Sequence, residues 1–154
     1  MESNMKPSIY WIGRAKGGVG KSIVSMALVD YLLSRKSTPL LVESDTSNPD
    51  VWKMYRETIG CQLLDLDEVD GWIGLVNACD AHPDKIVIVN TAARSNTGVV
   101  KFGATLGESL GELDRALVAV WAINRQRDSL ELLAEVGRKA ANGSGGYGML
   151  VGPH

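Results

Sequence analysis

The sequence predicts an α/β fold in which helices flank a mostly parallel β-sheet in three layers. Strand-like and helix-like segments alternate along the chain, which is the order expected for such a sheet. The strand-like segments are apolar throughout, a pattern typical of strands buried on both faces. With 154 residues, 45% of them hydrophobic, the chain can bury one core. We therefore expect residues 1–154 to form a single domain.

The first half of the chain supplies two expected strands and three expected helices. Residues 8–13 form an apolar run that stops at a glycine, and residues 21–36 repeat apolar side chains at helical spacing. A proline precedes the next apolar run, residues 40–44, which we expect to be the second strand. A proline at position 49 favours a helix over residues 51–59. Residues 69–79 are expected to form a further helix.

The second half continues the alternation. Residues 85–90 are rich in β-branched side chains, which predicts a buried third strand. Residues 98–113 place apolar side chains at helical spacing despite four glycines. Residues 116–123 predict a fourth strand, residues 127–142 a helix, and residues 147–152 a last strand. Because ligands of such sheets bind outside the carboxyl ends of the strands, we expect the site in the loops that follow strands one to four.

The amino-acid composition limits the kinds of partner that we expect. Sixteen Lys and Arg residues against eighteen Asp and Glu residues give a net charge of -2, so no overall basic field attracts nucleic acid. The longest apolar run, residues 116–123, is far shorter than the roughly 20 residues that span a bilayer. Cys61 and Cys79 lack metal-ligand spacing, which favours reduced thiols. We expect a cytoplasmic protein without a membrane partner.

The stretch RAKGGVGKS, residues 14–22, lies between the first expected strand and the first expected helix. Three glycines, Gly17, Gly18 and Gly20, allow the backbone N–H groups to point inward and form an anion-binding nest at the helix N-terminus. Lys21 can then contact terminal phosphates, and the Ser22 hydroxyl can join the shell of a phosphate-bound Mg²⁺. This context predicts a site for a polyphosphate.

The segment KGGVGKS resembles the deviant phosphate loop of the ParA/MinD group of ATPases. In that group the residue before the first lysine need not be glycine, which accommodates Ala15. The resemblance implies a SIMIBI-type P-loop NTPase fold, with ATP and Mg²⁺ as cofactors. It also implies that Lys16 reaches across a homodimer to the nucleotide of the other subunit. The implied nucleotide-binding residues are Ala15, Lys16, Gly17, Gly18, Val19, Gly20, Lys21, Ser22 and Ile23.

Asp45 follows the second expected strand, in VESDTSNPD. A carboxylate there can orient a water in line with the terminal phosphoryl group. The resemblance places Asp45 at the switch I aspartate, which implies roles in catalysis, with Lys16 and Lys21, and in the metal shell, with Ser22. Glu43 stands where the family often has another acid. A local Asx-turn role for Asp45 is the alternative.

The segment after the third expected strand resembles the switch II loop of the family and comprises Asn90, Thr91 and Ala92. Here the sequence departs from the pattern, because Asn90 stands in place of the usual aspartate. An amide oxygen can accept a hydrogen bond, but it brings no negative charge to Mg²⁺ and cannot act as a base. The departure makes slow ATP hydrolysis, or none, the expectation.

The leading functional hypothesis is an ATP-binding switch with weak ATPase activity that dimerises around Mg-ATP. The layout resembles the plasmid StbB and TraL proteins, which implies a role in plasmid partition, stability or conjugative transfer, with a plasmid DNA-binding or transfer protein as partner. Direct DNA contact through Asn124, Arg125 and Arg127 is a weaker alternative to a solvated helix. The competing functions are a nucleotide-binding adaptor with little hydrolysis and a small-molecule kinase or ligase. The expected base-contacting segment is missing, so either the chain is truncated or the base is held loosely.

Overall fold

The computed structural model describes residues 7–14, 20–92, 96–123 and 147–153. Within them, six strands form one sheet in the order β3-β2-β4-β1-β5-β6, and every neighbouring pair is parallel. The α/β prediction is therefore confirmed. The strands are β1 (Ile9–Arg14), β2 (Leu40–Glu43), β3 (Cys61–Leu63), β4 (Val87–Asn90), β5 (Leu117–Ile123) and β6 (Tyr147–Pro153).

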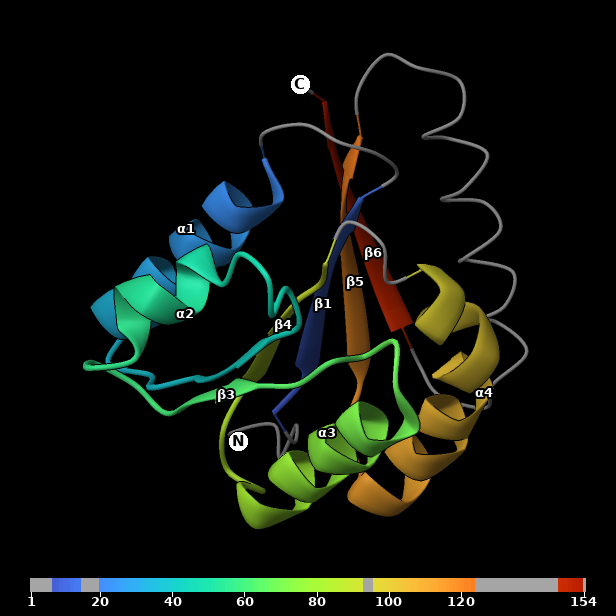
Figure 1. Cartoon of the computed structure of the whole chain (residues 1–154). Helices are drawn as coiled ribbons and strands as arrows, with labels where there is room; N and C mark the ends of the chain where they lie inside the picture. Colours follow the sequence, from blue (N-terminus) through green and yellow to red (C-terminus); the bar gives the residue numbers. More distant parts are fainter. Residues whose placement is uncertain (1–6, 15–19, 93–95, 124–146, 154) are drawn as a thin grey trace.

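Two described helices cover each face of the sheet, which gives three layers (Figure 1). On one face lie α1 (Lys21–Ser34) and α2 (Asp50–Tyr55), and on the other lie α3 (Val69–Ala81) and α4 (Asn96–Leu113). The core is divided in the same way. One apolar cluster joins Val29, Val51 and Ile88, and the other joins Trp11, Trp72 and Leu106. The continuous apolar strands thus serve two cores at once, as their sequence predicts.

The carboxyl ends of three strands meet at one edge of the sheet. Ile12 of β1 is paired with Asn90 of β4, and Asn90 is also the register partner of Glu43 in β2. The residues that follow these strands therefore begin at the same level. At the end of β1, Gly13 packs against the Trp121 ring, because a Cβ at position 13 would lie 2.5 Å from a ring carbon.

The opposite edge of the sheet is tied together by a buried arginine. Arg115, only 6% exposed, directs its guanidinium at four backbone carbonyls. It donates to Pro7 O at 3.1 Å, Lys85 O at 2.7 Å and Cys79 O at 3.1 Å, and to the carbonyl oxygen of His82. These contacts join the starts of β1 and β4 to the end of α3. A guanidinium suits these contacts because its several N–H donors are held in one rigid plane.

All five expected strands are present within two residues of their expected bounds. The sequence analysis missed β3, an edge strand of three residues that pairs only with β2 among the described strands. The second helix is shorter than expected and ends at Tyr55, after which residues 56–59 form turns. The expected helix over residues 127–142, with Asn124, Arg125 and Arg127 near its start, lies outside the described residues.

No helix in the described part of the chain is long and apolar enough to cross a bilayer. Cys61 and Cys79 are free thiols rather than a disulfide. Burial raises the pKa of the Cys61 thiol from 9.0 to about 11, and the nearby Glu43 charge acts in the same direction. Burial likewise raises the pKa of Cys79. Both thiols are therefore protonated and poorly nucleophilic at neutral pH.

Candidate functional site

The N-terminus of α1 opens at the carboxyl edge of the sheet. Gly20 is the N-cap residue, and its φ of 152° is a conformation that residues with a side chain rarely adopt. No side chain among the described residues caps the helix. The first intrahelical bond runs from Val24 N to Gly20 O at 2.8 Å, which places the start of the hydrogen-bonded helix at Gly20. Such a helix end, with its partial positive charge, suits an anion.

Lys21 lies on the inward side of this helix end. It shares the buried face of α1 with Ser25, Val29 and Leu32, and it is only 6% exposed. Ser22 is half-buried, while the Ile23 side chain is 58% exposed. The first turn of α1 therefore carries a buried lysine followed by a half-buried serine. Ala15, Lys16, Gly17, Gly18 and Val19, predicted to complete the loop, lie outside the described residues.

Asn90 connects α1 to β2 through its side-chain amide. Ser25 Oγ donates to Asn90 Oδ1 at 2.7 Å, and Asn90 Nδ2 donates to Glu43 Oε1 at 2.9 Å. The orientation of the amide is fixed by Glu43, because a carboxylate can only accept a hydrogen bond. Both ends of the amide are thus engaged. The residue that replaces the expected switch II aspartate is a buried structural link between two elements of the site.

Glu43 is the carboxyl group of this network. The side chain is fully buried, at 0% exposed, and its Oε1 also accepts the backbone N–H of Asp45 at 3.1 Å. Its Oε2 has no hydrogen-bond partner within the described structure. Burial raises the pKa of Glu43 above its ordinary value of 4.5, although the hydrogen bonds from Asn90 and Asp45 oppose the shift. A buried carboxyl oxygen without a partner is costly and marks the site as one that can accept a further donor or cation.

Asp45 begins a turn directly after β2. Its Oδ1 accepts hydrogen bonds from Ser47 Oγ at 3.0 Å and from Asn48 N at 3.1 Å. The local Asx-type contacts that the sequence left open as an alternative are therefore present. The side chain is half-buried. Asp45 thus lies at the carboxyl edge, as predicted, with its position fixed both by its own turn and by the bond to Glu43.

Thr91 and Ala92 join the end of β4 to the two neighbouring strand ends. Thr91 donates from both its hydroxyl, at 2.6 Å, and its backbone N–H, at 3.2 Å, to Ile12 O of β1. Ala92 N donates to Ser44 Oγ at 2.8 Å. Because the Thr91 hydroxyl is used in this way, its role in the described structure is to hold the segment. Residues 93–95 lie outside the described part of the chain.

Hydrogen bonds join Asn90 to Ser25 of α1 and to Glu43 of β2, and Glu43 in turn accepts the backbone N–H of Asp45. Lys21 and Ser22 lie in the turn of α1 that precedes Ser25. Sequence reasoning missed Ser25 and Ser44, whose hydroxyls bind Asn90 and the backbone N–H of Ala92 at the end of β4. Ser25 could have been found from its spacing, because a small polar residue four positions after Lys21 lies on the same helix face. No group of three or more His, Cys, Asp or Glu side chains that could hold a metal occurs among the described residues.

Comparison with known sequences gives one strong match. The chain is 62% identical over 131 residues to Protein MobD of Acidithiobacillus ferrooxidans, and the match covers 85% of this chain. It spans only 58% of the length of that relative. No protein-family model matches the sequence.

Comparison with solved structures identifies the fold. The chain superimposes on chloroplast FtsY from Physcomitrella patens with a TM-score of 0.63 and 13% identity, over 90% of this chain and 48% of FtsY. It superimposes on a plasmid partition protein from Borrelia burgdorferi with a TM-score of 0.60 and 16% identity, over 96% of this chain and 78% of that protein. The chain has the α/β fold of P-loop NTPases. These low identities establish the fold alone.

Proposed function

We propose that the chain is a nucleotide-dependent molecular switch that binds Mg-ATP at the carboxyl edge of its sheet. The observation that carries the proposal is the position of GKS, residues 20–22. These residues begin α1, with Gly20 as the N-cap residue and Lys21 on the buried face of the helix. The P-loop NTPase fold supports it, because this edge is where such sheets bind ligands.

The residues present fit a magnesium nucleotide. The N–H groups at the start of α1 and the Lys21 ammonium suit phosphate oxygens, and the Ser22 hydroxyl suits Mg²⁺. Glu43 Oε2, which lacks a partner within the described structure, gives the edge buried negative charge able to interact with a cation or its water shell. Bound Mg²⁺ supplies positive charge that offsets the charge of the phosphates.

Asp45 is the residue that we propose orients water for hydrolysis. Asn90 cannot assist as a base, and both ends of its amide are already bonded. The carboxylates of the site are therefore Glu43, which is buried and holds Asn90, and Asp45, which is half-buried. We expect hydrolysis to be slow because Asn90 offers no carboxylate at its position. Slow turnover suits a switch whose bound state has to persist long enough to engage a partner.

A homodimer is the proposed active form, with Lys16 contacting the nucleotide of the opposite subunit. We further propose a cytoplasmic role in plasmid partition, stability or conjugative transfer, with a plasmid DNA-binding or transfer protein as partner. The family resemblance of KGGVGKS supports both proposals, and the structural likeness to the Borrelia plasmid partition protein is consistent with the second. The chain matches only part of the longer MobD protein, and these proposals concern that part alone.

Sedimentation of the purified chain with a slowly hydrolysed ATP analogue and Mg²⁺ tests the proposed switch. We expect a monomer without nucleotide and a dimer with it, and we expect Lys16→Ala to remain monomeric while still binding nucleotide. Lys53→Ala is the matched control, since Lys53 is exposed on α2. A chain that binds no nucleotide under these conditions contradicts the whole proposal.

The second candidate function is a nucleotide-binding adaptor that scarcely hydrolyses ATP. It is favoured by Asn90, whose amide is engaged on both sides in place of a free carboxylate. Single-turnover measurements with labelled ATP separate the two functions. Stable binding without product over many hours supports the adaptor, whereas product formation that requires Asp45 supports the slow ATPase.

A further inference from the structure

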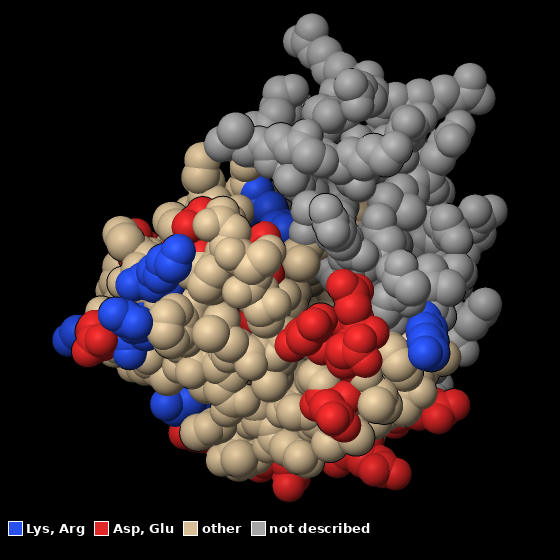
Figure 2. Space-filling model, in the orientation of Figure 1, with Lys and Arg blue, Asp and Glu red and all other residues tan. Residues whose placement is uncertain are grey.

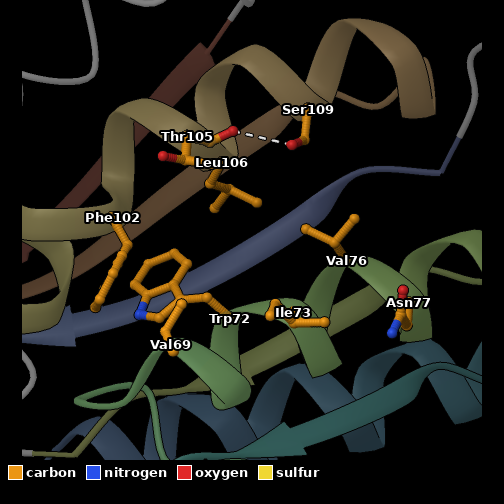
Figure 3. Close-up of a pocket in the computed structure, with 9 residues that line it drawn as sticks. All are labelled: Val69, Trp72, Ile73, Val76, Asn77, Phe102, Thr105, Leu106 and Ser109. Carbon is orange, nitrogen blue, oxygen red and sulfur yellow. Dashed lines mark hydrogen bonds between the residues drawn. The ribbon is translucent and has the colours of Figure 1, made fainter.

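An apolar groove lies between α3 and α4, away from the proposed nucleotide site. Its volume is about 260 Å³. Figure 3 shows side chains of both helices lining it, and Trp72 and Leu106, which are 6% and 4% exposed, lie at its base. Trp72 stacks on Trp11, with ring centroids 5.5 Å apart, and its Nε1 donates to Leu66 O at 2.6 Å. The floor of the groove is therefore rigid.

The groove presents apolar surface to solvent at helical spacing. Val69 and Ile73 on α3 are 51% and 53% exposed, although both are large apolar residues. On α4, Phe102, Leu106 and Ser109 follow at intervals of three or four residues. The two walls run side by side for about eight residues, or about 12 Å. A helix with one apolar stripe matches a groove of this length and spacing.

The groove is bordered mainly by acidic residues. The two helices carry four acidic residues and one basic residue, Lys101. Glu108 and Glu112 follow Thr105 by three and seven positions, which places them along the outer side of the groove on α4. Asp70 adjoins Val69 on α3, and Asp80 lies one turn beyond Val76. Figure 2 shows acidic side chains gathered over this part of the molecule.

Three further acidic residues, Asp65, Asp67 and Glu68, lie immediately before α3 and are exposed. The negative charge of the acidic border favours some groove-binding partners over others. Nucleic acid phosphates would be repelled, and a second copy of this chain, with the same acidic border, would bring like charges together. Basic residues along the polar edges of a bound helix would instead be attracted at both ends of the groove.

We propose that the groove between α3 and α4 is a docking site for a basic amphipathic helix of a partner protein. The apolar stripe of that helix packs on Val69 and Ile73 and over the groove beside them, while its Lys or Arg residues face the acidic border. The site does not depend on the bound nucleotide, so it can be tested separately from the proposed switch.

A pair of designed peptides provides the test. The first is an 18-residue helix with leucine at helical spacing and lysine on its other face, and the second replaces every lysine with glutamate. Anisotropy of each labelled peptide is followed on titration with the full chain at low and at 0.5 M salt. We expect the lysine peptide to bind at least about tenfold more tightly than the glutamate peptide and to lose affinity at high salt.

Two groove variants locate the binding. Ile73→Ser removes exposed apolar surface, and the double variant Asp70→Lys with Glu108→Lys reverses the border charge. We expect each to weaken binding of the lysine peptide by about five- to tenfold. The matched controls are Met54→Ser and Glu57→Lys, which alter exposed residues at the opposite face of the sheet and should leave binding unchanged. Circular dichroism confirms that all variants are folded.

The proposal is overturned if the two peptides bind equally, or if the control variants weaken binding as much as the groove variants do. It is also overturned if Ile73→Ser leaves the affinity unchanged while the charge reversals reduce it. That result would indicate general attraction to an acidic surface. Groove variants that change the oligomeric state of the chain, and leave peptide binding intact, would assign the surface to self-association instead.

Discussion

At the scale of single residues, the site depends on a buried pair, Glu43 and Asn90, joined by a hydrogen bond of 2.9 Å. The sequence alone suggests that an aspartate at position 90 would simply restore a missing catalytic carboxylate. The structure changes that expectation, because such an aspartate would face the buried Glu43 carboxyl group across the same distance. Neither residue of the pair can be altered without effect on the other.

We expect Asn90→Asp to lower the free energy of unfolding by about 2–4 kcal/mol, since two buried carboxylates repel and one loses its donor. The double variant Glu43→Gln with Asn90→Asp should recover most of this loss, because it exchanges the amide and the carboxylate. Urea unfolding measures both effects. Asn77→Asp, on an exposed helical position, is the control and should change stability by no more than about 0.5 kcal/mol.

Full stability of Asn90→Asp alone would contradict the predicted repulsion. The double variant is also the appropriate one for asking whether an aspartate at position 90 raises ATP turnover. In Asn90→Asp alone, any gain in ATP turnover would be obscured by the loss of the Glu43–Asn90 hydrogen bond.

At the scale of elements, the sequence predicts those with strong periodicity and misses those defined by their neighbours. Five strands and four of the helices follow from apolar runs and helical spacing. Strand β3 could not be predicted because three residues carry no period, and its only described partner is β2. The groove could not be predicted because it depends on how α3 and α4 pack together. The link from Ser25 to Asn90, 65 residues away, depends on tertiary structure in the same way.

Alanine substitutions at two glycines of α3 and α4 should have opposite effects on the free energy of unfolding. A Cβ at Gly111 of α4 meets nothing within 4 Å, so Gly111→Ala should raise the free energy of unfolding by about 0.5–1 kcal/mol through higher helix propensity. A Cβ at Gly71 of α3 would lie 1.8 Å from Asp65 O, so Gly71→Ala should destabilise the protein by more than about 2 kcal/mol. Thermal unfolding of both variants measures the difference. Equal effects would show that helix propensity alone governs these positions.

At the scale of the whole molecule, buried proton donors make the fold sensitive to alkali. Burial raises the pKa of Tyr55 from 10.0 to about 12, assisted by its hydrogen bond to Asp30 Oδ1 at 2.7 Å. The pKa of Cys61 is raised from 9.0 to about 11. Because the folded state holds these protons more tightly than the unfolded state, their contribution to stability is complete below about pH 9 and is lost as pH rises toward 12.

We therefore expect the urea midpoint to fall steadily between pH 9 and pH 12. Tyr55→Phe should lower stability at pH 7 by about 1 kcal/mol, through loss of the hydrogen bond, and should reduce the slope between pH 10 and pH 12. Tyr31→Phe is the control, because the Tyr31 side chain is 58% exposed. A slope that is identical in wild type and Tyr55→Phe would contradict the assignment.

The order of strands in the sheet has a consequence for synthesis on the ribosome. Ile9 pairs with Val87 and with Leu117, so β1 acquires its first neighbour only after nearly eighty further residues have been made. Its second neighbour follows about thirty residues later. Until then the apolar strand β1 emerges without a sheet to join, which favours aggregation and chaperone binding. The strand translated first thus waits longest for its partners, and the carboxyl ends of β1, β2 and β4 cannot assemble until β4 has left the exit tunnel.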